Sequence, residues 1–198
     1  MNDELAPPTF DPADAAAAAA RFVASAEPDV SYALLDSPVG TLVAARTERG
    51  LACLSYSDHA GGVDAVLEEI AARISPRVLE KPARLDEVAR ELDEYFEHRR
   101  TGFDLDLDWA LVSPFGRKVL GATAAIPFGE ISTYAKVAAL AGNANASRAA
   151  GNALSSNPMP IVVPCHRVLH TGGKGIGNYT GGVHRKEALL RLEGVLLG

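Results

Sequence analysis

The sequence predicts an α+β fold, in which a small N-terminal α/β domain with a short antiparallel-type sheet precedes a mainly helical C-terminal domain with a helix-turn-helix. Two observations predict it: short apolar stretches separated by glycines in the first half of the chain, and apolar residues at helical spacing beyond Trp109. With 198 residues, the chain is long enough for two small domains. We therefore divide it into an extension (residues 1–28), an N-terminal domain (29–108) and a C-terminal domain (109–198).

The chain begins with a segment rich in alanine, proline and acidic residues. Asp11 and Pro12 are suited to be the N-cap and the first residue of an Ala-rich helix that ends before Pro28. We expect residues 1–28 to be a mobile extension.

The N-terminal domain shows strand patterns first and helical patterns after them. Short apolar stretches separated by Gly40 and Gly50 predict a small β-meander, with strands at residues 32–35, 41–45 and 51–56. Helical spacing follows at residues 63–74 and 85–98. The second of these helices carries one apolar face, formed by Leu85, Val88, Leu92, Tyr95 and Phe96. The alternation from Asp104 to Asp108 predicts an exposed, extended linker.

Four helical segments are expected in the C-terminal domain, at residues 114–125, 133–141, 146–155 and 185–193. The two short central ones are separated by the turn Gly142-Asn143-Ala144-Asn145, which is the layout of a helix-turn-helix. This spacing is a weak signal by itself, because many pairs of short helices would match it. Arg148 lies near the start of the second helix among small residues, so this helix can approach a nucleic-acid groove closely.

Charge is distributed unevenly along the chain. The net charge is −6. Residues 1–110 contain 10 Lys and Arg and 22 Asp and Glu, whereas residues 111–198 contain 9 Lys and Arg and 3 Asp and Glu. The basic second half predicts contact with a polyanion, although a solvated surface with accidental polarity stays open. No apolar run approaches the ~18 residues of a membrane span and no basic start of a secretory signal is present, so we expect a cytoplasmic protein without membrane contact.

The two cysteines have different surroundings. Cys165 follows a short apolar run and precedes His166 and Arg167, and a cysteine beside titratable and cationic groups is a candidate nucleophile. Cys53 lies within the apolar stretch from Leu51 to Leu54, which predicts a core residue. We expect two free thiols rather than a disulfide.

Several motifs of the second half occur in the order of one known family. They are Ile126-Pro-Phe-Gly-Glu-Ile-Ser-Thr-Tyr134, Arg148-Ala-Ala-Gly151, Asn157-Pro158, Pro164-Cys-His-Arg167, Gly177-Asn-Tyr-Thr-Gly-Gly182 and Lys186 to Gly194. Through them the chain resembles the O6-alkylguanine-DNA alkyltransferases, also called methylated-DNA-protein-cysteine methyltransferases. Residues 32–105 fit more loosely, and residues 1–28 lie outside the resemblance.

The resemblance implies DNA repair by an enzyme that acts once. The Cys165 thiolate attacks the alkyl carbon on guanine O6 and keeps it irreversibly as a thioether. His166 passes the thiol proton toward Glu193, which orients the imidazole, and Tyr134 gives a hydrogen bond to the leaving guanine. Asn157 ties the turn that presents the cysteine. These roles are physically reasonable, because a thiol must lose its proton before it becomes a good nucleophile.

The resemblance also implies that the alkylated base is flipped out of the duplex, because a thiol cannot reach O6 inside a base stack. Arg148, on the second helix of the helix-turn-helix, would fill the gap through the minor groove. The other residues implied to contact the base or the DNA are Leu154, Val168, Tyr179, Thr180, Thr133, Gly151 and Ser147.

The implied partner is double-stranded DNA that carries O6-alkylguanine, with O4-alkylthymine left open, and neither a metal nor a cofactor is expected. We expect a monomer in solution and leave cooperative assembly on DNA open. A non-catalytic alkylated-DNA-binding protein of the alkyltransferase-like type is an alternative, but it would lack the cysteine. A cysteine hydrolase would need a catalytic histidine remote from Cys165 in sequence. Lys186, at a helix start, is expected at the surface.

Overall fold

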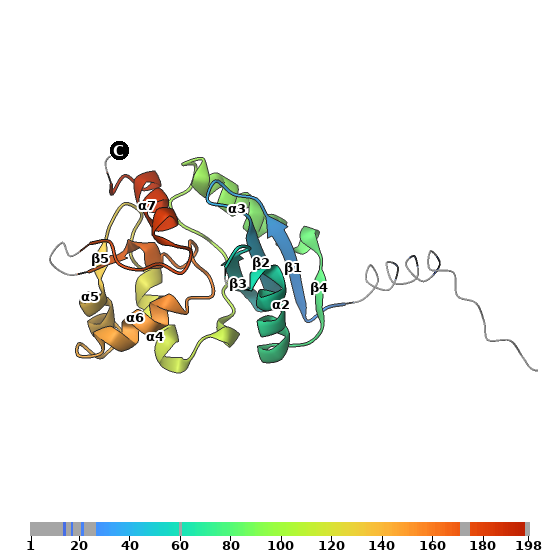
Figure 1. Cartoon of the computed structure of the whole chain (residues 1–198), viewed down its shortest axis with the longest axis horizontal. Coiled ribbons are helices and arrows are strands. Elements are labelled where there is room, and N and C mark those ends of the chain that lie inside the picture. Colours follow the sequence, from blue (N-terminus) through green and yellow to red (C-terminus); the bar gives the residue numbers. More distant parts are fainter. Residues whose placement is uncertain are drawn as a thin grey trace, which may run out of the picture.

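The computed structural model describes residues 27–59, 61–170 and 175–196, together with Asp14, Ala17 and Arg21. The expected extension and its Ala-rich helix therefore lie almost entirely outside the described residues. We call the described residues up to 108 the N-terminal part and those from 109 the C-terminal part. The two parts lie side by side (Figure 1), and one main core cluster contains residues of both.

The N-terminal part is built on a four-stranded sheet. Its strands are β1 (Val30–Leu35), β2 (Leu42–Thr47), β3 (Gly50–Tyr56) and β4 (Val78–Glu80), in the order β3-β2-β1-β4. The first three pair antiparallel, which confirms the predicted meander. The fourth strand pairs parallel with β1 and is absent from the prediction, because three residues are too few to show a period.

Helices cover both faces of this sheet. α2 (Gly62–Arg73) places Ile70 against the face that carries Cys53. α3 (Asp86–Phe96) follows the short 3₁₀ helix η1 (Pro82–Leu85), and its apolar face joins the main core on the other side of the sheet. Because both faces are covered, the residues of β2 and β3 are buried almost without alternation.

The C-terminal part is mainly helical, as predicted. Its helices are α4 (Pro114–Ala124), α5 (Tyr134–Leu140), α6 (Ser147–Ser155) and α7 (Val183–Leu192), with the 3₁₀ helices η2 (Trp109–Leu111) and η3 (Cys165–Arg167). α4, α5 and α6 pack on one another, and the short turn between α5 and α6 gives the expected helix-turn-helix. Ser113 caps α4 by accepting a hydrogen bond from the Gly116 amide at 3.1 Å.

A short parallel ladder ties the helix-turn-helix to the cysteine segment. β5 (Ser132–Thr133) pairs with β6 (Val168–Leu169), and this pairing is another feature that two-residue segments cannot reveal in a sequence. The Thr133 hydroxyl also caps α5, because it accepts a hydrogen bond from the Lys136 amide at 3.2 Å. The ladder therefore fixes the start of α5 relative to the residues that follow Cys165.

The linker between the two parts is extended as predicted, but its last residue is not exposed. The carboxylate of Asp108 accepts hydrogen bonds from Thr47 Oγ1 at 2.6 Å, Arg49 Nε at 3.1 Å and the Ala110 amide at 3.0 Å. These three donors compensate for its burial, so the expectation of an exposed Asp108 is wrong.

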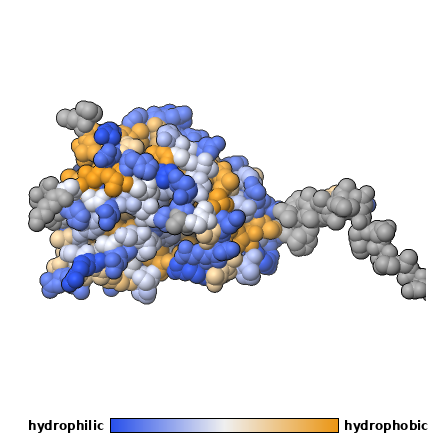
Figure 2. Space-filling model, viewed as in Figure 1, coloured by the Kyte–Doolittle hydropathy of each residue, from blue (hydrophilic) through white to orange (hydrophobic). Residues whose placement is uncertain are grey.

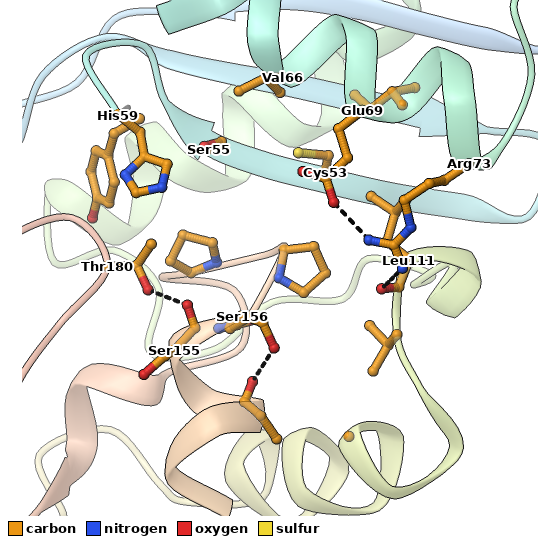
Figure 3. A pocket seen from close by; sticks show the side chains of 18 of the residues that line it. Cys53, Ser55, His59, Val66, Glu69, Arg73, Leu111, Ser155, Ser156 and Thr180 are labelled. Carbon is orange, nitrogen blue, oxygen red and sulfur yellow. Dashed lines mark hydrogen bonds and ion pairs between the residues drawn. The ribbon is translucent and has the colours of Figure 1, made fainter. Parts of the chain in front are cut away.

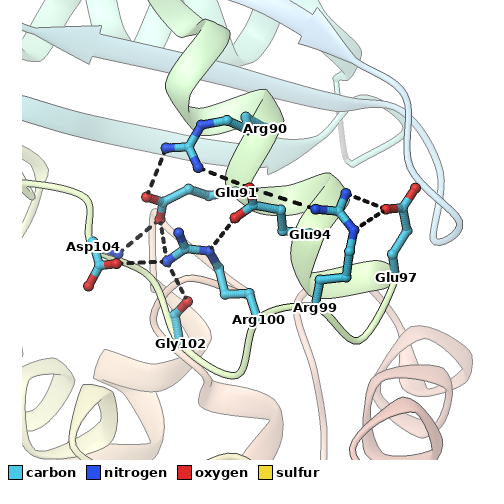
Figure 4. A network of polar contacts seen from close by, with 8 residues as sticks. All are labelled: Arg90, Glu91, Glu94, Glu97, Arg99, Arg100, Gly102 and Asp104. Atoms are coloured by element: carbon cyan, nitrogen blue, oxygen red, sulfur yellow. Dashed lines mark hydrogen bonds and ion pairs between the residues drawn. The ribbon is translucent and has the colours of Figure 1, made fainter.

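The beginning of the linker is held by a network of ion pairs on α3 and the segment that follows it (Figure 4). Arg100 binds Glu94 at 3.0 Å and Asp104 at 3.0 Å. The buried carboxylate of Glu91 accepts a hydrogen bond from the Asp104 amide at 2.9 Å. The linker is thus attached to the N-terminal part near both of its ends.

Polar and apolar residues are interspersed on the surface shown in Figure 2. Among the described residues, the exposed large apolar side chains are scattered along the chain, at Leu34, Ile131, Leu140 and Val183. Among the described residues, no helix combines the length and the apolar character that crossing a membrane requires.

Candidate active site

Cys165 begins η3, directly after Pro164, and is 6% exposed. Its Sγ accepts a hydrogen bond from Asn157 Nδ2 at 3.2 Å. The same nitrogen donates to the Val163 carbonyl at 2.9 Å, and Asn157 Oδ1 accepts from the Met159 amide at 3.0 Å. One buried amide side chain therefore holds the sulfur and the backbone on both sides of the turn.

The segment before Cys165 is anchored on the N-terminal sheet. The Leu54 amide, in β3, donates to the Pro158 carbonyl at 2.7 Å. Ile161 is buried with a φ of 75°, a conformation that β-branched residues rarely adopt and that costs about 1–3 kcal/mol. Only tight packing keeps such a residue in place, so the backbone that leads to Cys165 follows one fixed path.

Lys186 is completely buried, and the expectation that it lies at the surface is wrong. Its Nζ donates to the Val168 carbonyl at 2.7 Å and to the Asn178 carbonyl at 3.4 Å. Burial lowers the pKa of Lys186 to about 8, and its charge interaction with Cys165 opposes that shift. An ammonium group therefore acts on Cys165 from inside the protein.

Burial raises the pKa of the Cys165 thiol, while the Asn157 hydrogen bond and the Lys186 charge act in the lowering direction. Burial is the largest of these effects, so the resting group is a thiol and needs a base before it can react. A new negative charge on sulfur would find the Asn157 donor and the Lys186 cation already in place.

Glu193 is the centre of a buried, hydrogen-bonded cluster that includes His166, the residue after Cys165. Its Oε1 accepts hydrogen bonds from Tyr95 OH at 2.6 Å, His166 Nε2 at 2.8 Å and Arg167 Nη2 at 2.7 Å. Its Oε2 accepts from Arg167 Nε at 2.8 Å. Burial raises the pKa of Glu193, but the hydrogen bonds from His166 and Arg167 outweigh it and bring the pKa to about 2. The carboxylate is therefore ionised at neutral pH and can only accept hydrogen bonds.

This cluster fixes the tautomer of His166. Because Glu193 only accepts, the proton of the neutral imidazole is on Nε2, and Nδ1 carries a lone pair. Nδ1 is buried and has no hydrogen-bond partner among the residues that the structure describes. Burial lowers the pKa of His166 despite the Glu193 hydrogen bond, so the ring is neutral at pH 7. A free basic nitrogen thus belongs to the residue next to the thiol.

Tyr134 is the first residue of α5 and is half-buried. Its ring lies 5.1 Å from the His170 ring, and Gly151 packs against it, since a Cβ at position 151 would lie 3.8 Å from the ring. Burial raises the pKa of Tyr134, and Cys165 contributes to the rise through its charge. Tyr134 and Gly151 therefore pack against each other, and Tyr134 also packs against the core cluster that contains Cys165.

The remaining predicted residues fall into two groups. Leu154, Val168 and Tyr179 pack in or against the core cluster that contains Cys165, and Thr180 Oγ1 donates to the Ser155 carbonyl at 2.7 Å. Ser147 and Arg148 are the first residues of α6, and the Arg148 side chain is exposed. They take no part in the hydrogen bonds around Cys165.

Sequence reasoning missed Tyr95 and the role of Arg167. Tyr95 belongs to the apolar face of α3, and the helical pattern does not indicate that its hydroxyl binds Glu193. Arg167 did carry a signal, because an arginine among apolar residues is buried only when it is paired. Cys53 is buried as expected, with its pKa raised to about 12 by burial and by Glu69.

The fold and the site combine a buried, hydrogen-bonded cysteine with a helix-turn-helix, which is the arrangement of a DNA-binding protein with a candidate nucleophile. Two family models match the chain: 6-O-methylguanine DNA methyltransferase, ribonuclease-like domain, at residues 30–109, and 6-O-methylguanine DNA methyltransferase, DNA binding domain, at residues 114–195. The chain therefore belongs to the 6-O-methylguanine DNA methyltransferase family.

Individual relatives agree with this assignment. The chain is 35% identical over 163 residues to the methylated-DNA-protein-cysteine methyltransferase of Methanosarcina acetivorans, which covers 82% of this chain and 97% of the relative. It is 38% identical over 172 residues to the human protein of that name, with 83% and 80% covered. Mycobacterium tuberculosis OGT, solved in complex with DNA, superposes with a TM-score of 0.71 at 33% identity and covers 83% of this chain and 93% of that one.

Proposed function

We propose that this protein repairs DNA by transferring the alkyl group of O6-alkylguanine directly to Cys165. The observation that carries the proposal is the Cys165 sulfur, held 3.2 Å from Asn157 Nδ2 beside a histidine whose Nδ1 has no hydrogen-bond partner in the described part of the chain. A non-catalytic damage-binding protein would not need this arrangement. The relatives of this chain are named as methylated-DNA-protein-cysteine methyltransferases, and this protein is an enzyme of that class.

The proposed reaction is one displacement at saturated carbon. A sulfur–carbon bond forms as the bond between that carbon and guanine O6 breaks, and the electron pair passes to the guanine. His166 Nδ1 accepts the thiol proton, directly or through a water molecule, and Glu193 stabilises the imidazolium that results. The Lys186 cation stabilises the thiolate, and the Tyr134 hydroxyl donates to a ring nitrogen of the guanine.

DNA is the partner, and its duplex form and the flipped base belong to the proposal. Arg148 is exposed near the start of α6, the second helix of the helix-turn-helix, where it can enter the space that an extruded base leaves. Ser147, Thr133 and Gly151 are proposed to meet the DNA or the base from the same helices. Leu154, Val168, Tyr179 and Thr180 are proposed to line the pocket for the base.

Single use follows from the thiols. Cys53 is buried and has a pKa of about 12, so it is a poor acceptor for an alkyl group on Cys165. We also propose that the protein acts as a monomer in the cytoplasm, where its two unpaired cysteines stay reduced.

The test is incubation with duplex DNA that contains a single O6-methylguanine. Mass spectrometry should find the peptide with Cys165 heavier by one CH₂ group, with a yield that levels off near one repaired base per protein. Cys165→Ser should abolish transfer and keep DNA affinity, because groove and phosphate contacts supply the binding. The control Cys53→Ala should transfer normally. Transfer by Cys165→Ser, or repair beyond a stoichiometric yield, would contradict the proposal, and binding without transfer by the wild type would favour the non-catalytic alternative.

A further inference from the structure

Tyr56, the last residue of β3, reaches from the N-terminal sheet to the loop that carries Tyr179. The two hydroxyl oxygens lie 3.0 Å apart, and the rings meet edge to face with centroids 6.2 Å apart. Tyr56 is almost completely buried. One hydrogen bond thus connects a residue of the sheet to a proposed wall of the alkyl pocket.

Tyr56 is itself held firmly by Arg185 of α7. The guanidinium carbon lies 4.2 Å from the centre of the Tyr56 ring, which is a cation–π contact. Arg185 also donates to the Val39 carbonyl at 2.7 Å, to the Gly181 carbonyl at 3.0 Å and to Asp58 Oδ2 at 2.8 Å. The arginine therefore joins two loops of the N-terminal part to the Tyr179 loop, with the Tyr56 ring beneath it.

The loop lies directly on the Tyr56 ring. A Cβ at position 181 would come within 2.2 Å of a ring carbon, so only Gly181 permits this approach. On the neighbouring side, the Thr180 hydroxyl donates a hydrogen bond to the Ser155 carbonyl. Both residues line a cleft of about 430 Å³ between the two parts, and Ser55 and His59 line it from the N-terminal part (Figure 3). The loop is therefore fixed from both sides, and Tyr179 has little freedom to move away from the site.

Tyr179 in turn stands close to the reacting groups. Its ring meets the His166 ring edge on, with centroids 6.5 Å apart and an angle of 87° between the planes. Burial raises the pKa of Tyr179 well above its usual value, and the next largest contribution comes from Cys165. A displacement of Tyr179 would therefore change the space around the cysteine.

We propose that Tyr56 is a positioning residue that fixes Tyr179 at the wall of the alkyl pocket, so that the N-terminal sheet limits the size of the alkyl group that Cys165 accepts. This inference rests on the proposed alkyl transfer. Tyr56 acts through its hydrogen bond to the Tyr179 hydroxyl and makes no hydrogen bond to Cys165.

The test compares transfer from duplex DNA with O6-methylguanine and with O6-benzylguanine. Tyr56→Phe removes the hydroxyl and keeps the ring on which Arg185 and Gly181 pack. We expect the ratio of benzyl to methyl rate constants to rise about threefold to tenfold, which is the range set by the net value of one hydrogen bond. Tyr32→Phe, which removes a hydroxyl from β1 of the same sheet, is the matched control and should leave the ratio unchanged. Tyr179→Phe and the double variant should both give the ratio of Tyr56→Phe, because all three lack the same hydrogen bond.

Hydrogen exchange supplies a second measurement that does not depend on transfer. The Gly182 amide donates to the Tyr179 carbonyl at 2.9 Å, and its exchange should become faster in Tyr56→Phe but not in Tyr32→Phe. Three results would overturn the positioning role alone, provided the wild type transfers normally. They are an unchanged benzyl-to-methyl ratio in Tyr56→Phe, additive effects in the double variant, and unchanged Gly182 exchange in Tyr56→Phe. A wild-type protein that transfers no alkyl group would overturn the proposed function as well.

Discussion

Replacement of Glu193 by glutamine tests the cluster that prepares His166. The substitution keeps the shape of the side chain but removes the charge that Tyr95, His166 and Arg167 surround. Glu193 is 5% exposed, and loss of one partner from a buried ion pair costs about 3–5 kcal/mol. The lowering of its pKa from 4.5 to about 2 gives a consistent value of about 3 kcal/mol at neutral pH. We therefore expect Glu193→Gln to lose about 3 kcal/mol of unfolding free energy.

Urea unfolding at several pH values measures this loss. Because the pKa of Glu193 is lowered in the folded state, its contribution is present above the unfolded value of 4.5 and is lost as the pH falls through about 2. The stability difference between the wild type and Glu193→Gln should therefore narrow from about pH 4.5 downward. Transfer at neutral pH should also slow by about 10²-fold or more, because glutamine no longer stabilises the imidazolium.

Glu187→Gln, on α7 just before Glu193 in the chain, is the control. Its side chain is 39% exposed and lies 3.6 Å from Arg191, and such surface pairs contribute about 0–1 kcal/mol. This control should unfold and transfer like the wild type. The reasoning about Glu193 would be refuted if Glu193→Gln were within about 1 kcal/mol of the wild type or transferred at the wild-type rate.

Three other predictions concern Arg148 at the DNA, His166 as the proton acceptor, and the alkylated product. Arg148→Ala should slow repair of duplex DNA far more than reaction with free O6-benzylguanine, which needs no base extrusion; equal losses would show that Arg148 supports the fold instead. Because the pKa of His166 is lowered from 6.5, its ring stays neutral near pH 7. The reaction with free O6-benzylguanine should therefore not slow until the pH falls below 6.5. If the rate constant fell on acidification with a midpoint above pH 7, His166 would not be the proton acceptor. Alkylation of Cys165 should lower the melting temperature, because the added carbon disturbs the Asn157 hydrogen bond in a filled site and typically costs ~1–3 kcal/mol. An unchanged or higher melting temperature, read by calorimetry after complete reaction, would refute the strain argument.

The sequence predicts the elements whose patterns are long enough to show a period. The meander, the two N-terminal helices and the helix-turn-helix are of this kind. β4, β5 and β6 contain only two or three residues, and contacts with distant segments decide whether such short strands form. Asp108 looked exposed because nothing local shows that Thr47 and Arg49 surround its carboxylate.

The candidate site divides in the same way. Cys165 and His166 are adjacent in sequence, so a local motif predicts them. Lys186 and Tyr95 could not be predicted as site residues, because their polar atoms are near the site only after folding. Tyr95, for example, is 98 residues away from Glu193 in the chain. Helical periodicity places its ring in the core but says nothing about the hydroxyl.

The contacts that complete the site from the N-terminal part place few demands on the surrounding sequence. Leu54 contributes a backbone amide to Pro158, and nearly any residue can supply one. Tyr95 and Tyr56 each contribute one hydroxyl at the end of a side chain that otherwise packs as an apolar residue. Contacts of this kind require one tyrosine hydroxyl or one backbone group in the right place and leave the surrounding sequence free to vary. The cysteine segment is constrained much more strongly, because several side chains must meet within one short turn.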